Sequence, residues 1–135
     1  MRPFRRRLVI LPALAASLMM FAAAPDTALA YAEALARAER YEDDPAARNW
    51  RATQMNPVLQ KAIGPILDAC VPLNATHKPD FSLVVSFRAG VFEAVRFTAD
   101  EPMATCIVDR LAVLKWPAPP KPDFAEEIHL NLNSK

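Results

Sequence analysis

Residues 105–124 read TCIVDRLAVLKWPAPPKPDF, an apolar run around a cysteine that ends in a cluster of prolines. The apolar residues leading into the prolines recur at helical spacing, which predicts an amphipathic helix: Met103, Cys106, Ile107, Leu111 and Leu114. That helix must end before Pro117, because the residue preceding a proline is pushed out of the helical region. The prolines then favour a stiff, extended segment. We expect this segment to be a strap that joins the helix to a last strand of the same core.

The last strand is predicted over residues 124–132. Its apolar residues lie on one face, and Glu127, His129 and Asn131 lie on the other. The apolar set is Phe124, Ile128, Leu130 and Leu132.

Upstream, the residues FSLVVSFRAGVFEAVRF, numbered 81–97, alternate with the period of a β-hairpin. Ala89 and Gly90 supply the turn, and Ser82 and Ser86 are expected to face solvent. Phe92 and Val95 are three residues apart, so a bulge or register change near Glu93 is needed to turn both inward.

A second helix is predicted to begin at Asn56, with Asn56 as its cap, and to end at Cys70. Asp100 is expected to cap the later helix. The chain order is then helix, strand, strand, helix, strand. It predicts an α+β fold in which a small antiparallel three-stranded sheet packs on two helices.

Two shorter regions precede this domain of residues 56–135. Residues 31–55 are rich in alanine and predict a helical segment with few bulky apolar residues, loosely attached to the rest. Residues 1–30 predict a signal peptide, because arginines precede an apolar run and Ala28 and Ala30 suit a cleavage site before Tyr31. A retained membrane anchor is the alternative. General secretion is favoured over the twin-arginine route.

Removal of residues 1–30 takes away four Arg and one Asp, which leaves 12 basic and 14 acidic residues and a net charge of −2. That charge argues against nucleic acid and against an anionic membrane surface as partners. Cys70 and Cys106 form an even pair in an exported chain, which predicts a disulfide that closes a loop of 37 residues. A catalytic thiol or a metal pair are the alternatives.

Residues suited to chemistry are few, and we predict that the chain is not an enzyme and holds no metal or cofactor. His77 and His129 have no partners at metal-ligand spacing and are interpreted as surface residues. The acidic pair Asp100 and Glu101 precedes a proline at a helix start, where capping explains it. A small hydrolase or thiol enzyme is the least favoured reading.

The order of these features resembles the C-terminal domain family of TonB and TolA, including stand-alone versions of the AgmX and PglI type. The resemblance covers residues 56–132 and rests on a Cys that ends the first helix, the hairpin, the helix MATCIVDRLAVL with the second Cys, and KWPAPPKPDFAEEIHLNL. The hairpin turn departs from the Asp-Gly that the family often has.

A three-stranded sheet has two edges, and an exposed edge can pair with an extended peptide. The resemblance implies that partner segments bind at the last strand, which selects Phe124, Ile128, His129, Leu130 and Leu132. We therefore expect a periplasmic or secreted module that binds a segment of a cell-envelope or outer-membrane protein, with no stable membrane insertion after cleavage. The alternative is a structural subunit whose N-terminal segment covers that edge.

Overall fold

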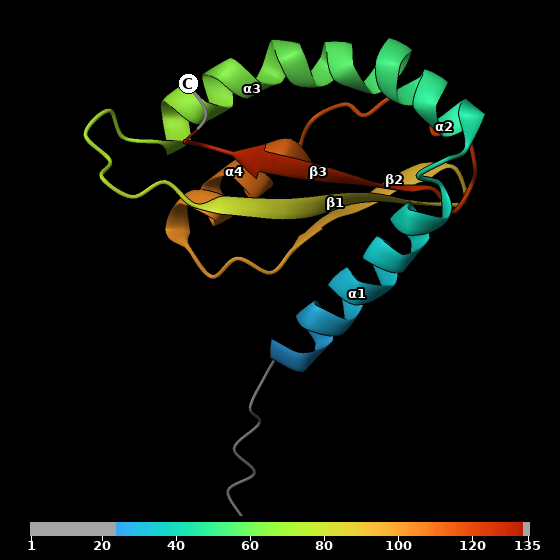
Figure 1. Cartoon of the computed structure of the whole chain (residues 1–135), viewed down its shortest axis with the longest axis horizontal. Coiled ribbons are helices and arrows are strands. Elements are labelled where there is room, and N and C mark those ends of the chain that lie inside the picture. The colour runs from blue at the N-terminus through green and yellow to red at the C-terminus, as the bar shows by residue number, and fades with distance from the viewer. Residues whose placement is uncertain (1–23, 134–135) are drawn as a thin grey trace, which may run out of the picture.

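The computed structural model describes residues 24–133 and shows the predicted α+β fold with a three-stranded antiparallel sheet (Figure 1). Most of the predicted signal peptide lies outside the described residues, and the predicted cleavage point before Tyr31 falls within the first helix. The elements are α1 (Ala24–Arg40), α2 (Pro45–Trp50), the π-helical turn η1 (Arg51–Met55), α3 (Asn56–Cys70), β1 (Asp80–Arg88), β2 (Val91–Phe97), α4 (Pro102–Ala112) and β3 (Ala125–Asn131).

The sheet has the strand order β2-β1-β3, so β1 is its middle strand. The register of β1 and β2 shifts between Ser86 and Phe87, which makes Glu93 the extra residue of a β-bulge. This irregularity confirms the prediction made from the spacing of Phe92 and Val95. Without the extra residue, one of those two side chains would leave the core face.

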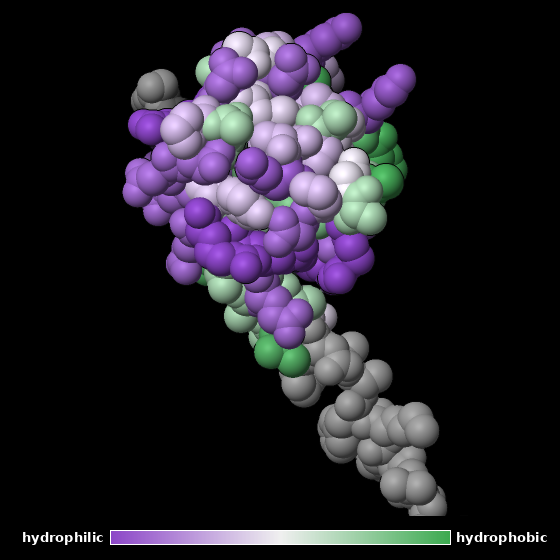
Figure 2. Space-filling model, turned by 90° about the vertical axis from the view of Figure 1, so that its right-hand side faces the viewer, coloured by the Kyte–Doolittle hydropathy of each residue, from purple (hydrophilic) through white to green (hydrophobic). Residues whose placement is uncertain are grey.

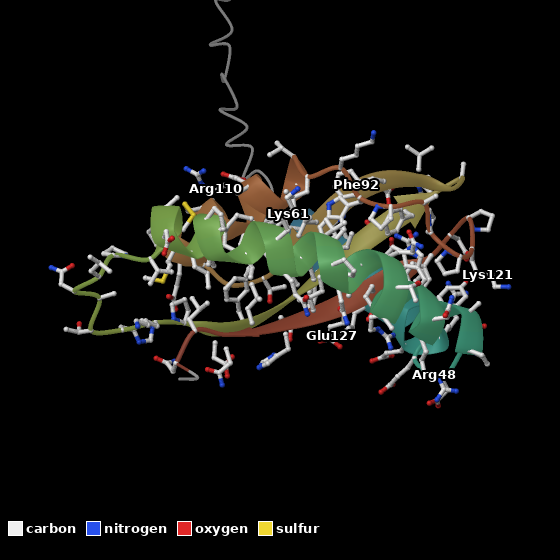
Figure 3. The ribbon with its side chains drawn as sticks, turned by 90° about the horizontal axis from the view of Figure 1, so that it is seen from above. Arg48, Lys61, Phe92, Arg110, Lys121 and Glu127 are labelled. Atoms are coloured by element: carbon white, nitrogen blue, oxygen red, sulfur yellow. A yellow bond between two sulfur atoms is a disulfide. The ribbon has the colours of Figure 1, made fainter. Side chains whose placement is uncertain are left out.

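One face of the sheet packs against α3 and α4 and forms the main core. The alternating apolar residues of β1 supply its centre: Phe81, Leu83, Val85 and Phe87. The predicted disulfide is present and joins Cys70 at the end of α3 to Cys106 of α4, with 5.7 Å between their Cα atoms (Figure 3). The two helices that cover this face are therefore linked covalently.

The opposite face of the sheet is covered by α1, which the sequence did not predict. Ala34 and Ala38 of α1 pack on Val84 of β1 and Ala125 of β3. Ser86, expected to face solvent, is fully buried there. Alanine side chains let the helix approach the sheet closely, so the segment taken as loosely attached is the third layer of the molecule.

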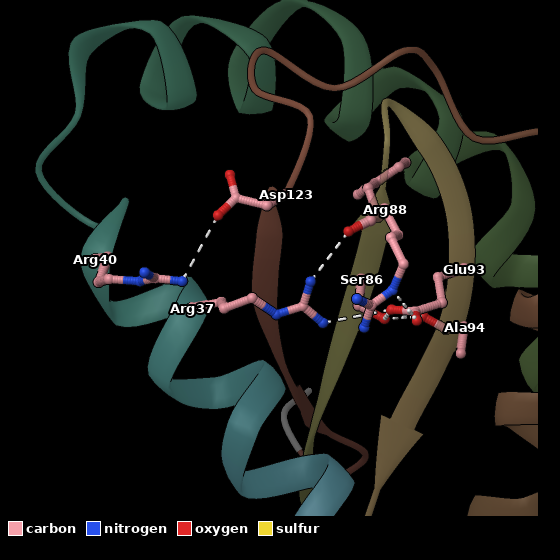
Figure 4. A network of polar contacts seen from close by, with 8 residues as sticks. Arg37, Arg40, Ser86, Arg88, Glu93, Ala94 and Asp123 are labelled. Atoms are coloured by element: carbon pink, nitrogen blue, oxygen red, sulfur yellow. Dashed lines mark hydrogen bonds and ion pairs between the residues drawn. The ribbon is translucent and has the colours of Figure 1, made fainter.

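Polar contacts tie α1 to the hairpin (Figure 4). The Arg37 guanidinium donates to the Phe87 carbonyl at 3.1 Å and lies 3.4 Å from a carboxylate oxygen of Glu93. Arg88 donates to the other oxygen of Glu93 at 2.8 Å. The bulge therefore turns Glu93 toward α1, where its carboxylate bridges two arginines.

α3 begins at Asn56 and ends at Cys70, as predicted, but it follows α2 and η1 without a break, so the prediction that Asn56 caps the helix is wrong. Asn56 has helical dihedral angles, and its amide donates to the carbonyl of Arg51, five residues earlier. Pro57 would clash with a carbonyl of a regular α-helix, and the wider π turn directly before it moves those carbonyls. The core residues Trp50 and Met55 precede Asn56, which joins residues 31–55 to the same packed unit.

α4 begins differently from the prediction. Glu101, not Asp100, occupies the N-cap position, with extended backbone angles of φ −138° and ψ 138° and no side-chain cap hydrogen bond. The extended backbone places Pro102 as the first helical residue, where its missing amide proton costs nothing.

The proline strap after α4 crosses to β3, as expected. The Trp50 indole donates to the carbonyl of Ala118 at 2.6 Å, and the Gly90 amide donates to the carbonyl of Pro122 at 3.0 Å. The strap is therefore held by α2 on one side and by the hairpin turn on the other.

In the part of the chain that the structure describes, no helix combines the length and the apolar character that crossing a membrane requires. Figure 2 views the end of the molecule that lies at the right of Figure 1. Its surface is mostly hydrophilic, with apolar groups in small, separate areas.

Candidate functional site

Among the described residues, β3 pairs with β1 on one side and with no strand on the other, so it is an edge strand of the sheet. β3 pairs with β1 without interruption from Ala125 opposite Ser86 to Asn131 opposite Asp80. Figure 1 shows β3 at the border of the sheet.

The register decides which backbone groups of β3 face outward. The Phe87 amide donates to the Phe124 carbonyl at 2.9 Å, so these opposed residues form a hydrogen-bonded pair. Hydrogen-bonded and non-hydrogen-bonded pairs alternate along an antiparallel ladder. Glu126, Ile128 and Leu130 therefore bond to β1. The amides and carbonyls of Glu127 and His129 point away from the sheet.

Of the side chains that the sequence predicted to contact a partner, most are buried or half-buried. Phe124 is fully buried, with its ring centroid 5.0 Å from that of Trp50, so it is a core residue and cannot contact a partner. Ile128, Leu130 and Leu132 are half-buried and pack against the main core. Only His129 of the predicted set is exposed.

The other sheet edge is less suited to pairing with a partner. The bulge at Glu93 interrupts the regular spacing of β2. Bulges are one of the devices that protect edge strands from unwanted pairing. β3 has no such interruption, so it offers the more regular template.

A buried ion pair holds the beginning of β3. Glu126 is 6% exposed, and its carboxylate accepts two hydrogen bonds from Arg51 of η1, one of them at 3.0 Å. Hydrogen bonding to Glu126 raises the pKa of Arg51. The sequence placed Glu126 in the last strand, but only the proximity of η1 reveals its role.

Nearby, the Tyr41 hydroxyl donates to Asp123 at 2.6 Å. This hydrogen bond lowers the pKa of Asp123 and raises the pKa of Tyr41. Arg40 lies 3.7 Å from the other oxygen of Asp123 (Figure 4). These contacts therefore fix the end of α1 to Asp123, just before β3 begins.

A hydroxyl, an imidazole and a carboxylate lie close together on the face of the sheet that α1 covers in part. The sequence did not predict this group. Ser82 Oγ lies 3.0 Å from His129 Nδ1, and His129 Nε2 lies 3.0 Å from an Asp80 oxygen. The side chains of His129 and Asp80 are 60% and 49% exposed. Catalytic groups of this kind act in sites that exclude water, so this arrangement is a solvated surface network.

His77 is also exposed and lies 3.4 Å from Glu101. Among the described residues, no group of three or more His, Cys, Asp or Glu side chains is placed to bind a metal. Both cysteines of the chain are in the disulfide.

No family model matches the chain, and neither a curated protein nor a solved structure matches it.

Proposed function

We propose that the chain is an exported binding module, not an enzyme, that captures an extended segment of a cell-envelope protein beside β3. The captured segment becomes a fourth strand of the sheet. The observation that carries this proposal is the outward row of backbone groups on β3, backed by an unbroken ladder with β1. Such an edge binds through main-chain hydrogen bonds, and alternate side chains supply specificity.

The disulfide supports a location outside the reducing cytoplasm, since such bonds persist in the periplasm and in secreted proteins. The resemblance to TonB and TolA domains supports the same mode of binding. The proline strap also supports the proposal, because its hydrogen bonds to α2 and to the hairpin turn hold the beginning of β3 in place.

The alternative function is a structural subunit whose own N-terminal segment covers the binding edge. α1 contacts all three strands, so it crosses the face of the sheet instead of running along β3. Its position therefore favours the binding module.

The test distinguishes binding through the backbone of β3 from binding through its side chains. In His129→Pro the outward amide is lost, whereas His129→Ala keeps it. Proline is tolerated on an edge strand where its nitrogen faces solvent, so both variants should fold. We expect the protein purified after export to capture its partner from envelope extract, His129→Ala to retain capture, and His129→Pro to lose it.

Circular dichroism and thermal unfolding check that both variants are folded. His77→Ala, an exposed change far from β3 in the sequence, is the matched control. Equal capture by His129→Pro and the parent protein would contradict binding by strand addition.

A further inference from the structure

We infer that the segment bound at β3 carries lysine or arginine beside the first half of the strand. This inference rests on the proposed function and specifies the chemistry of the partner. It starts from a hollow of about 310 Å³ between the end of α1, η1 and the beginning of β3. Its lining residues are Ala38, Glu39, Glu42, Arg51, Glu126 and Glu127.

The hollow carries an excess of negative charge. Of its four carboxylates, Glu126 is neutralised by Arg51. Glu39, Glu42 and Glu127 are exposed, and none of them has an ion-pair partner within 4.0 Å among the described residues. Burial and, second, the charge of Glu127 raise the pKa of Tyr31 on α1.

The register places a partner residue beside this charge. A side chain directly opposite Glu127 on an added strand lies on the same face of the sheet, about 5 Å away. That face also carries the end of α1 with Glu39 and Glu42. Figure 3 shows Glu127 beside β3, on the side of the molecule away from Phe92 and Arg110.

The neighbouring positions of the added strand meet a different surface. On that face the added strand lies opposite Glu126, Ile128 and Leu130, and the side chains of Ile128 and Leu130 join the apolar core. The fitting partner therefore alternates apolar residues with basic ones, the basic residues lying toward α1. Several such charge pairs at a partly exposed edge should favour a basic over an acidic segment by about tenfold.

A tethered segment tests this inference without a known partner. The full chain is extended at its C-terminus by a flexible Gly-Ser linker and a nine-residue strand that alternates Val with Lys, Thr or Glu. Tethering supplies an effective concentration near millimolar, which is enough to detect weak pairing. Hydrogen exchange at the outward amides of Glu127 and His129 measures the pairing, with the unextended chain as reference.

We expect the Lys segment to protect both amides about tenfold more than the Glu segment, with the Thr segment between them. The preference should fall below about twofold in the triple variant Glu39→Gln, Glu42→Gln, Glu127→Gln, and should shrink in high salt. The control variant Asp68→Asn, Asp100→Asn, Asp109→Asn removes three exposed carboxylates that do not line the hollow and should keep the preference.

Four outcomes would contradict either the charge preference or the binding edge. Equal protection by all three segments would refute the charge preference and leave strand addition standing. Loss of the preference in the control variant would assign it to net charge instead of the hollow. Protection by no segment, or protected amides in the unextended chain, would refute the open binding edge itself.

Discussion

At the scale of single residues, the hairpin turn contains an alanine in an unfavourable conformation. Ala89 and Gly90 connect the paired residues Arg88 and Val91, with φ values of 51° and 76°. Two positive φ angles define a type I′ turn, which matches the twist of the strands and prefers Asn-Gly. Glycine adopts this region freely, whereas an alanine does so at a cost of about 1 kcal/mol.

We therefore expect Ala89→Asn to stabilise the protein by about 1 kcal/mol, because asparagine tolerates a positive φ and completes the preferred Asn-Gly pair. Urea unfolding of the variant and the parent measures the change. Gly90→Ala is the matched opposite change and should destabilise the protein, since φ at position 90 is also positive. An unchanged or lower midpoint for Ala89→Asn would contradict the turn assignment.

Glu93 links the stability of the fold to pH. Hydrogen bonding from Arg88 and Arg37 holds the pKa of Glu93 below its usual value of 4.5, although burial acts in the opposite direction. A carboxylate with a lowered folded pKa stabilises the protein above its unfolded pKa. That contribution is lost as the pH falls through the folded pKa.

We expect Glu93→Gln to lower the free energy of unfolding by about 1 kcal/mol at neutral pH. The two proteins should converge in strongly acidic solution, where Glu93 is protonated in both states. Urea titrations across this pH range test the prediction. A constant difference at every pH would show that the charge of Glu93 does not stabilise the hairpin.

At the scale of elements, the ion pair of Arg51 and Glu126 joins the helical run to β3. Glu126 is almost fully buried, whereas the side chain of Arg51 is 30% exposed. Removing one partner of a buried pair leaves an unpaired charge, which costs more than replacing both by apolar residues.

Arg51→Ala should therefore destabilise the protein by about 3 kcal/mol. The double variant Arg51→Met, Glu126→Leu should recover most of that loss. Arg48→Ala is the control, because Arg48 is exposed on the same run (Figure 3) and its side chain donates to a backbone carbonyl, that of Asp43, instead of to a buried carboxylate. If Arg51→Ala were no worse than Arg48→Ala in thermal unfolding, the pair would contribute nothing to the fold.

At the scale of the whole molecule, the disulfide joins α3 to α4 and also restricts the conformations open to the unfolded chain. Its cysteines are 36 positions apart, and closing a loop of that size stabilises a folded protein by about 4 kcal/mol in the chain-entropy model. That contribution is a large part of the net stability of a single domain.

We expect Cys70→Ser, Cys106→Ser to lose about 4 kcal/mol, or to unfold near body temperature. Unfolding of the parent protein with and without a reductant gives an independent measure. A thiol titration of the native, unreduced protein should find no reactive group. Two accessible thiols there would refute the disulfide.

Periodicity and turn chemistry sufficed for much of the fold. The switch from helical spacing to alternation placed β1 and β2, and the misfit between Phe92 and Val95 located the bulge. The start of α3 at Asn56 was predicted correctly, but the capping role given to Asn56 was wrong for a physical reason. A π turn directly before Pro57 keeps the helical run continuous, so Asn56 has helical backbone angles and its side chain caps no free helix end.

Residues 105–124 by themselves determined a helix, the end of that helix and the extended strap that leads to β3. Local backbone chemistry decides such features, because a proline acts on its immediate neighbours wherever it lies. Only the tertiary structure decided that α1 covers the second face of the sheet and that η1 neutralises Glu126. It also decided that Phe124 is core and that Glu127 and His129 present the outward amides. These facts depend on which distant elements meet and in which register, and no local pattern in a single chain encodes that.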